Sequence, residues 1–277
     1  MEKKRIYILV KTYPTISETY AELVCTAGIL EDGSWIRLYP VPFRKLDLEQ
    51  KYPKFSWIEV ETARNTKDFR PESYRPNLET LSVVQEAKKK LDWEERRRII
   101  FGNQHVYTNL EELITKAKAD DISLAVFKPA RILSFNASKT NPSWDPAKLA
   151  NLEYVSRQLN VFQTVDEIVD EFRVVPKVPY HFSYKFLDDS GRQSTMKILD
   201  WEIGMLYVNC LKRAGGNKEI AVEKVRQKYY EEFLKHDLHF FLGTTLKHHK
   251  VAKNPFTIVG VFYPPFPSKQ LNLFDLA

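Results

Sequence analysis

Basic and aromatic side chains are interleaved near the start of the chain, in the stretch VKTYPTISETYAELVCTAGILEDGSWIRLYPVPFR. Aromatic rings stack on nucleobases, and ammonium or guanidinium groups neutralise the phosphates between the bases. The stretch therefore suits a groove for single-stranded nucleic acid. Its candidate contact residues are Lys11, Tyr13, Trp35, Arg37, Tyr39 and Arg44.

Three of these residues alternate within the segment WIRLYP. If the segment forms a strand, Trp35, Arg37 and Tyr39 share one face, as in a sheet that binds a nucleic-acid strand. The same pattern also suits two core aromatic residues with Arg37 paired to Glu22 or Glu31. The sequence leaves both interpretations open.

Two further basic segments are candidates for phosphate contact. Residues 88–98, KKKLDWEERRR, are expected to be helical, and Lys89 and Arg96 lie seven positions apart and so share a face. The alternative is a solvated helix face whose charges pair with one another. His248 and His249 stand between two lysines, which is typical of a basic loop that is compatible with phosphate.

Acidic residues and histidines near the C-terminal half raise the alternative of a metal-dependent nuclease or nucleotide-modifying enzyme. Its carboxylates would be Asp200 and Glu202, with histidines from residues 236–249. However, Asp200 is better placed to cap a helix, and the two carboxylates would then point to different sides of that helix. Neither a phosphate-binding loop nor an H-E-x-x-H motif is present in the sequence. We therefore expect no catalytic residue, no metal and no cofactor.

Composition and charge limit the class of protein. The 277 residues allow one large domain or two smaller ones, and the net charge of +6 permits a polyanionic partner. The sequence contains no run of about 18 apolar residues, so no membrane-spanning helix is predicted. Cys25 and Cys210 lack C-x-x-C spacing, so we expect neither a disulfide framework nor a zinc site, and a cytoplasmic protein.

Short strands are expected to position the N-terminal candidates. Apolar runs predict strands at 5–13, 20–30, 35–43 and 52–65, with Asp32-Gly33 as a hairpin turn between the second and the third. A loop with two prolines is expected at 68–80. Helices follow at 82–100 and 109–120, the second capped by Thr108 or Asn109, and then a strand at 123–135 that is broken at Lys128-Pro129.

The same plan of strand, hairpin, helix and strand is expected again in the C-terminal half. We predict a helix within 152–171, strands from 172 to 199, a helix from Asp200 to Gly215-Gly216 and a second helix over 217–235. Two paired strands with a long connection follow at 239–249 and 256–265. The predicted domains are 1–135, a linker and helix at 136–171, 172–263, and an extended tail at 264–277.

The N-terminal stretch resembles a family of uncharacterised bacterial proteins that are described as dual-OB domain proteins. The resemblance also covers SLAVFKPARIL, LDWEIGMLYVNC, HFFLGTT and FTIVGVFYPPF, and so nearly the whole chain. It implies an α+β fold of two OB-like β-barrels with helical inserts, and such barrels commonly bind oligonucleotides on one strand face. It supplies no catalytic residue.

A short apolar motif follows the proline-rich segment PPFPSK near the end of the chain. Gln270-Leu271-Asn272-Leu273-Phe274 resembles the peptide by which many bacterial proteins bind the DNA polymerase sliding clamp. Gln270, Leu271, Leu273 and Phe274 match its anchors, whereas Asn272 stands where serine or aspartate is more usual. The alternative is that these apolar residues pack back on the chain as a last strand.

Together these patterns predict a non-catalytic, nucleic-acid-binding accessory protein that is tethered to the sliding clamp. It would act in replication, repair or mobile-element conflict. Two alternatives remain: the clamp-recruited enzyme, and a protein–protein adaptor without nucleic-acid contact. The salt dependence of any DNA binding separates the adaptor from the nucleic-acid-binding protein, because phosphate neutralisation loses affinity steeply as salt rises.

Overall fold

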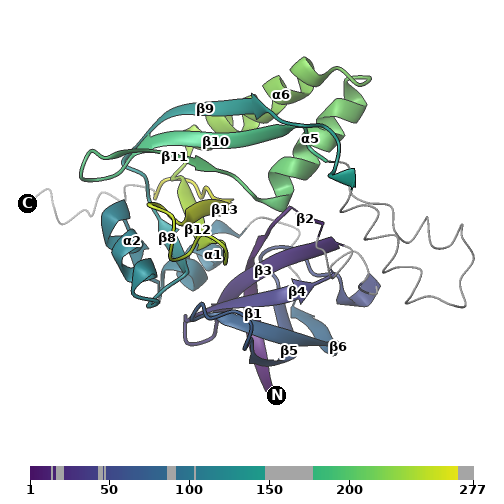
Figure 1. Ribbon diagram of the computed structural model, residues 1–277, viewed down its shortest axis with the longest axis vertical. Helices are drawn as coiled ribbons and strands as arrows, with labels where there is room; N and C mark the ends of the chain where they lie inside the picture. The colour runs from purple at the N-terminus through teal and green to yellow at the C-terminus, as the bar shows by residue number, and fades with distance from the viewer. Residues whose placement is uncertain are drawn as a thin grey trace, which may run out of the picture.

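Figure 1 shows the computed structural model of the chain, a mixed α+β protein in which strands predominate. It describes residues 1–13, 15–16, 22–42, 46, 48–85, 92–102, 104–146 and 177–267. The predicted helix within 152–171, the tail motif at 270–274, Arg44 and Lys89 lie outside the described residues.

Five strands of the N-terminal half pair in a closed ring. They are β1 (Glu2–Lys11), β3 (Glu22–Leu30), β4 (Trp35–Val41), β5 (Trp57–Arg64) and β6 (Ser73–Gln85), and the short β2 (Thr15–Ile16) extends β3. The ring order is β1-β3-β4-β6-β5, and β5 pairs again with β1. All neighbours are antiparallel except β4 and β6, which are parallel.

Local chemistry explains two features of this ring. The predicted hairpin is confirmed: Gly33 adopts a φ of 84° in the turn between β3 and β4, a conformation that glycine tolerates best. A Cβ atom on Gly28 would lie 2.2 Å from the carbonyl oxygen of Tyr7, so the close approach of β1 and β3 requires glycine there.

The region from 68 to 100 differs from the prediction. Strand β6 begins at Ser73 and continues to Gln85, so the expected loop ends early and the expected helix begins late. Pro76 is accommodated because β6 pairs with β4 only at Ser73 and Tyr74, which leaves one edge open at the proline. Val83 pairs with Ile58 of β5, and this pairing holds the start of the expected helix in a strand.

The described residues of the C-terminal half form two sheets. One has the order β11-β10-β9 and the other β13-β12-β8-β7. Their bounds are β7 (Val106–Tyr107), β8 (Leu124–Phe127), β9 (Arg131–Lys139), β10 (Tyr180–Leu187), β11 (Gln193–Lys197), β12 (His239–Thr244) and β13 (Phe256–Phe262). Strands β8 and β9, which the prediction placed in the domain 1–135, pair with β12 and β10 of this half.

The two C-terminal sheets are joined at both ends. On one side β8 continues into β9 through Lys128 and Pro129, the break that the sequence predicts. On the other side a parallel bridge links Ile198, just after β11, to Ile258 of β13. The six longer strands therefore form a second ring, in which β8 and β9 act as one interrupted strand.

Within the described residues four α-helices connect the strands, and each begins at a capping side chain. They are α1 (Trp93–Phe101), α2 (Leu110–Lys118), α5 (Trp201–Arg213) and α6 (Lys218–Arg226), and α6 continues through η3 (Gln227–Glu232) and η4 (Phe233–Lys235). The predicted caps Asn109 and Asp200 are confirmed, because each side chain accepts a hydrogen bond from a backbone N–H of the first turn.

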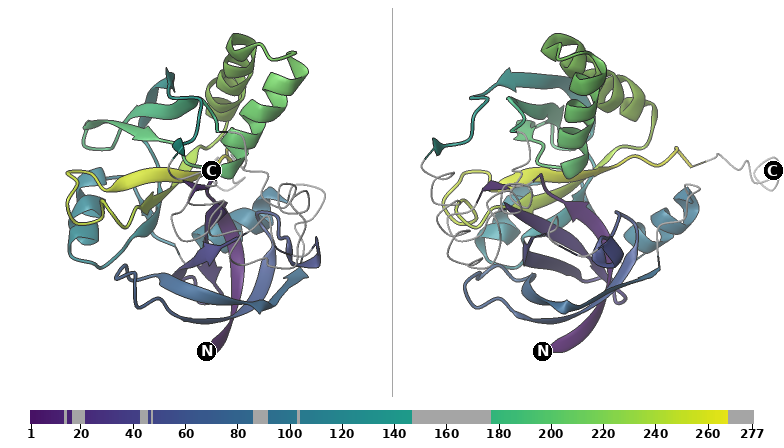
Figure 2. Two further views of the ribbon diagram at one scale, coloured as in Figure 1. Left: turned by 45° about the vertical axis from the view of Figure 1, so that its right-hand side comes forward. Right: turned by 90° about the vertical axis from the view of Figure 1, so that its right-hand side faces the viewer.

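A shared apolar core joins the two halves. Tyr7, Leu9 and Val10 of β1 pack with Phe241 of β12 and Phe262 of β13. The two further views in Figure 2 show strand β13, in yellow, lying between the N-terminal ring and helices α5 and α6. The surfaces by which the halves meet are therefore fixed by packing rather than by a linker.

Candidate nucleic-acid interface

The strand face that was predicted to bind nucleic acid lies on β4, and the structure packs it against the C-terminal half. The ring of Trp35 lies edge-on to that of Phe241, with centroids 6.0 Å apart. Arg37 is 1% exposed and donates from Nη1 to Oγ of Ser123 over 2.7 Å. Since a buried guanidinium cannot reach a phosphate, we correct the prediction for Arg37. Tyr39 is half-buried at the end of the strand, and its role stays a prediction.

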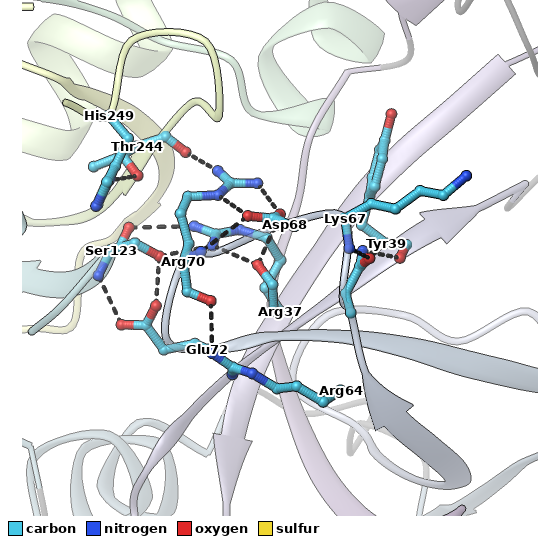
Figure 3. A network of polar contacts seen from close by, with 12 residues as sticks. Arg37, Tyr39, Arg64, Lys67, Asp68, Arg70, Glu72, Ser123, Thr244 and His249 are labelled. Carbon is cyan, nitrogen blue, oxygen red and sulfur yellow. Dashed lines mark hydrogen bonds and ion pairs between the residues drawn. The ribbon is translucent and has the colours of Figure 1, made fainter. Parts of the chain in front are cut away.

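Arg37 belongs to a buried polar network between the halves, which Figure 3 shows. Glu72 accepts hydrogen bonds from the backbone N–H of Ser123 (2.7 Å) and from its hydroxyl. Burial and then the like charge of Arg70 lower the pKa of Arg37 below its ordinary value, although Glu72 and Asp68 act in the opposite direction. The alternative partner Glu31 instead pairs with Arg5 at the surface.

The same network connects the loop before β6 to the end of β12. Arg70 pairs with Asp68 over 2.6 Å and donates to the carbonyl oxygen of Thr244. The hydroxyl of Ser73 donates to Asp68 over 2.8 Å. These bonds fix the loop at residues 65–72 against the C-terminal half.

Lys11 and Tyr13 also face the protein interior. Lys11 is 8% exposed, and its Nζ donates to the carbonyl oxygen of Tyr52 over 3.1 Å. Burial and the neighbouring Lys54 lower its pKa to about 8. The Tyr13 ring packs on Gly204 of α5 so closely that a Cβ atom there would lie 2.1 Å from the ring. We therefore correct the prediction that the buried Lys11 contacts nucleic acid, whereas the contact of the half-buried Tyr13 stays a prediction.

The two carboxylates of the enzyme alternative pair with one buried lysine. The Nζ atom of Lys54 lies 3.3 Å from Oδ2 of Asp200 and 3.1 Å from Oε2 of Glu202. Burial raises the pKa of Asp200 to about 6, against the lowering by Lys54. Burial lowers the pKa of Lys54, but Asp200 and Glu202 outweigh it and raise the pKa. The buried lysine and the carboxylate beside it form a contact that is typical of a structural ion pair.

Arg96 departs from the predicted basic stripe on helix α1. Its guanidinium is buried, 4.2 Å from the ring centroid of Phe55 and 5.5 Å from that of Trp93. Because α1 packs this face on the protein, Arg96 does not line an open phosphate-binding surface, and we correct that prediction.

Two loops that are far apart in the sequence meet where the halves join. Residues 65–72 connect β5 to β6, and residues 245–255 connect β12 to β13. The rings of Phe69 and His249 lie edge-on with centroids 5.5 Å apart, and Nζ of Lys250 lies 4.7 Å from the Phe69 centroid. Phe69 nevertheless stays 49% exposed. An exposed aromatic ring can stack on a base, and the ammonium group beside it can neutralise the phosphate of that nucleotide.

The two histidines of the predicted basic loop have different positions. His248 is exposed, whereas His249 is buried with its Nδ1 atom 2.7 Å from Oγ1 of Thr244. Nε2 of His249 lies 3.3 Å from Oδ1 of Asp120, whose other oxygen pairs with Lys250 over 2.6 Å. Burial lowers the pKa of His249, although Asp120 raises it. His249 therefore supports the loop, and only His248 is available to a ligand.

Both loops also carry exposed basic side chains. We call Phe69 together with these side chains the loop surface; its other members are Lys67, Lys247, His248, Lys250 and Lys253. Asp120 is an acidic neighbour within it. The arrangement suits a ligand that combines an aromatic face with negative charge.

Sequence reasoning missed Phe69 and Lys67. Phe69 lies in the segment 68–80 that was predicted as a loop, and Lys67 directly precedes that segment. Here an aromatic residue stands between charged ones, the same interleaving that drew attention to the N-terminal stretch. What no local pattern showed is that this loop meets residues 245–255.

Two searches of the described residues bear on other classes of function. Within those residues no three His, Cys, Asp or Glu side chains are grouped as a metal ion would require. Nor does any helix in that part of the chain combine the length and apolar character needed to cross a membrane.

Comparison with known families follows the division into two rings. The model of a family described as "Domain of unknown function (DUF8757)" matches residues 105–277, more than half of the chain. The chain belongs to the DUF8757 family. A second model, "Domain of unknown function (DUF8758)", matches residues 2–102. In this DUF8757 protein the two matches meet between α1 and β7.

Other comparisons add little for this DUF8757 member. No curated protein matches it. A solved structure described as "Structure of murine DNA binding protein bound with ds DNA" is 12% identical over 72% of this chain and 73% of that chain, with a TM-score of 0.28. A TM-score this low carries no argument, so nothing said of that protein is transferred.

Proposed function

We propose that the chain is a non-catalytic, nucleic-acid-binding accessory protein that is tethered to a DNA sliding clamp. It would act in replication, repair or mobile-element conflict. The observation that carries the nucleic-acid part is the loop surface, where the centroid of the half-exposed Phe69 ring lies 4.7 Å from the Lys250 ammonium group and both loops carry further exposed basic side chains.

We further propose that each ring is an OB-like barrel, with the division near residues 102–105. If β1, β3, β4, β5 and β6 are counted one to five, the ring order is 1-2-3-5-4 and strands 3 and 5 are parallel. The second ring repeats this order with β8/β9, β10, β11, β12 and β13, and its bridge between Ile198 and Ile258 is also parallel. The repeat of a Greek-key order supports the proposal.

On this proposal, the loop surface corresponds to loops by which OB barrels bind oligonucleotides. OB barrels bind oligonucleotides through the face of strands 2 and 3 and the loops between strands 1–2 and 4–5. In the N-terminal ring the strand face is covered, since Trp35 packs on Phe241 and Arg37 is buried. Among the described residues, the loops between strands 4 and 5 are residues 65–72 and 245–255. Equivalent loops of two barrels thus meet in one surface.

The clamp part of the proposal rests on Gln270, Leu271, Leu273 and Phe274, which match the anchors of clamp-binding peptides. A short peptide with few anchors binds weakly by itself. A clamp encircles the same DNA that the loop surface would contact, so two weak contacts reinforce each other through effective concentration.

The nucleic-acid proposal is tested by fluorescence anisotropy with a labelled single-stranded oligo-dT and a labelled duplex. We expect the single strand to bind more tightly, with affinity falling steeply as salt rises. Phe69→Ala should weaken single-strand binding by about 1–3 kcal/mol, the range for one stacked base. Lys67→Ala and Lys247→Ala should each weaken binding and make the salt dependence less steep.

The matched control is Lys3→Ala, because Lys3 is an exposed lysine that pairs with Glu59 on β5, away from both loops. It should bind as the unmodified chain does. The proposal fails if neither DNA binds at low salt, or if the Phe69 and lysine variants bind like the Lys3 control. Binding with little salt dependence would instead favour a protein–protein adaptor.

The tether is tested separately with a peptide of residues 264–277 and a bacterial sliding clamp. Saturable binding by this peptide, and none by the same peptide with Leu273→Ala and Phe274→Ala, is the expected result. If neither peptide binds, the tether is excluded while the nucleic-acid proposal stands.

A further inference from the structure

A cavity of about 280 Å³ opens between helix α1, the start of α5 and the end of β13. Its lining includes Lys54, Phe55, Trp93, Arg96, Glu202 and Tyr263. The size lies near the lower end of small-molecule pockets, about 300–1,000 Å³, and suits one nucleoside-sized ligand. None of the residues of the loop surface lines it.

Aromatic rings form much of the wall. The Trp93 ring lies edge-on to Tyr263 with centroids 5.5 Å apart, and Phe55 and Phe262 complete the set with centroids 6.2 Å apart. Rings in several orientations around one cavity offer stacking partners to a flat aromatic ligand.

Phe55 also has an unusual backbone. Its φ of 64° lies in the left-handed region, which a bulky residue adopts only when surrounding structure holds it there. Its N–H donates to the carbonyl oxygen of Ile8 over 2.7 Å, which fixes the residue to β1. Strained residues of this kind cluster at ligand-binding sites.

Charged groups of opposite sign line the same cavity. Arg96 is 7% exposed and lies 4.2 Å from the Phe55 centroid, so its guanidinium is held on an aromatic face at the cavity wall. Glu202 pairs with Lys54 but keeps 48% of its side chain exposed, which leaves its carboxylate able to accept further hydrogen bonds. The cavity thus offers both a donor and an acceptor.

We infer that this cavity binds a nucleobase, with guanine preferred. The rings stack on the base, the Glu202 carboxylate accepts from its N–H groups, and Arg96 donates to its carbonyl oxygen or ring nitrogen. Guanine presents acceptors at O6 and N7 together with N–H donors, so it suits both charged groups. An aliphatic ligand would offer no hydrogen-bonding partner to Glu202 and Arg96, and a lone inorganic anion would leave the rings uncovered.

The base belongs either to a free nucleotide or to a nucleotide turned out of a strand. Both present the same base to the cavity, so the same contacts would bind either one. The inference does not depend on the loop surface. It goes beyond the proposed function by assigning base recognition to a second place on the molecule.

The test is calorimetric titration of the full chain with GMP, AMP, CMP and UMP. We expect saturable binding with GMP the tightest, and Trp93→Ala should weaken it about 5- to 150-fold, as the loss of one stacking partner does. Glu202→Gln should reduce the preference for GMP. The matched controls are Trp144→Ala and Glu219→Gln, the latter at the same first-turn position of α6 that Glu202 has in α5.

Two further variants separate loss of the cavity from misfolding and from loss of the loop surface. If Trp93→Ala does not fold, Glu202→Gln still tests the site, since Lys54 keeps Asp200 as a partner. Phe69→Ala should leave GMP binding unchanged, so failure of the loop surface and failure of this cavity are separate results.

The source of the base is tested with oligo-dT that carries a single dG. Tighter binding of this strand than of plain oligo-dT, lost in Trp93→Ala, assigns the cavity to a base of a strand. If the two strands bind equally and the separate titration shows saturable GMP binding, the cavity is assigned to a free nucleotide. The inference is overturned if no mononucleotide and no dG dependence is detected, or if Trp93→Ala and Glu202→Gln bind GMP as the controls do.

Discussion

The Arg37 guanidinium on β4 donates to the Ser123 hydroxyl over 2.7 Å and to the Ser123 carbonyl oxygen over 3.2 Å. Ser123 directly precedes β8, so this buried pair connects the N-terminal ring to the first strand of the second ring. Arg37, for which the sequence left nucleic-acid contact and a core ion pair both open, therefore joins the two halves of the chain.

Replacing Arg37 should therefore destabilise the whole chain. Arg37→Leu removes the charged donor to Ser123 and leaves the buried Glu72 carboxylate without that positive neighbour. We expect a loss of about 3 kcal/mol in the free energy of unfolding, measured with urea. Arg5→Leu, which breaks the exposed pair with Glu31, should cost less than about 1 kcal/mol. Equal effects of the two variants would contradict a structural role for Arg37.

Breaking the buried ion pair of Lys54 and Asp200 should also destabilise the chain. Lys54→Met leaves a fully buried carboxylate without its cation, and we expect a loss of about 3–5 kcal/mol in urea unfolding. Lys54→Met combined with Asp200→Asn should recover part of it, because the uncompensated charge is gone. Lys3→Met, at the exposed pair with Glu59, is the control and should cost under about 1 kcal/mol. A small effect of Lys54→Met would argue against the buried pair.

Lys11 should leave a signature in the pH dependence of stability. Its pKa falls from 10.5 in the unfolded chain to about 8 in the folded one, first because of burial and then because of Lys54. Between pH 8 and 10.5 the unfolded chain binds more protons at this amine, so its contribution to stability rises with pH through that window.

The measurement compares urea unfolding of the unmodified chain and Lys11→Met from pH 7 to 10.5. Buried tyrosines also titrate in the alkaline range, but they contribute equally to both proteins and cancel in the difference. The stability difference should shift in favour of the unmodified chain as pH rises. A difference that stays constant across the range would show that the Lys11 amine is not perturbed by folding.

Gly204 should not tolerate a side chain, although it lies in the interior of helix α5. A Cβ atom there would meet the Tyr13 ring at 2.1 Å, so Gly204→Ala must displace the ring. We expect a net loss of about 1–3 kcal/mol despite the better helix propensity of alanine. Asn209→Ala, at an exposed position of α5, should be close to neutral.

A double variant tests the contact itself. If the clash with Tyr13 is the cause, Tyr13→Ala with Gly204→Ala should be less destabilised than the sum of the single variants. Simple additivity would place the cost of Gly204→Ala elsewhere.

Local patterns in the sequence determined much of the secondary structure. The Asp32-Gly33 hairpin, the caps Asn109 and Asp200 and the break at Lys128-Pro129 all depend on neighbours within a few residues. Such features are decided by backbone conformation and by hydrogen bonds that form locally, and they can be found in a sequence. The alternation of Trp35, Arg37 and Tyr39 on one strand face is of the same kind.

Only the tertiary structure decided what those side chains contact. Residues 82–85 became a strand because β5 offered backbone partners, and the Trp35–Arg37 face became an interface because the C-terminal half supplied Phe241 and Ser123. Phe69 lies beside Lys250, a residue far away along the chain, only because their two loops meet. An interleaved aromatic and basic pattern is the same whether it faces solvent or a second domain. Burial and long-range pairing distinguish the two, and neither is a property of local sequence.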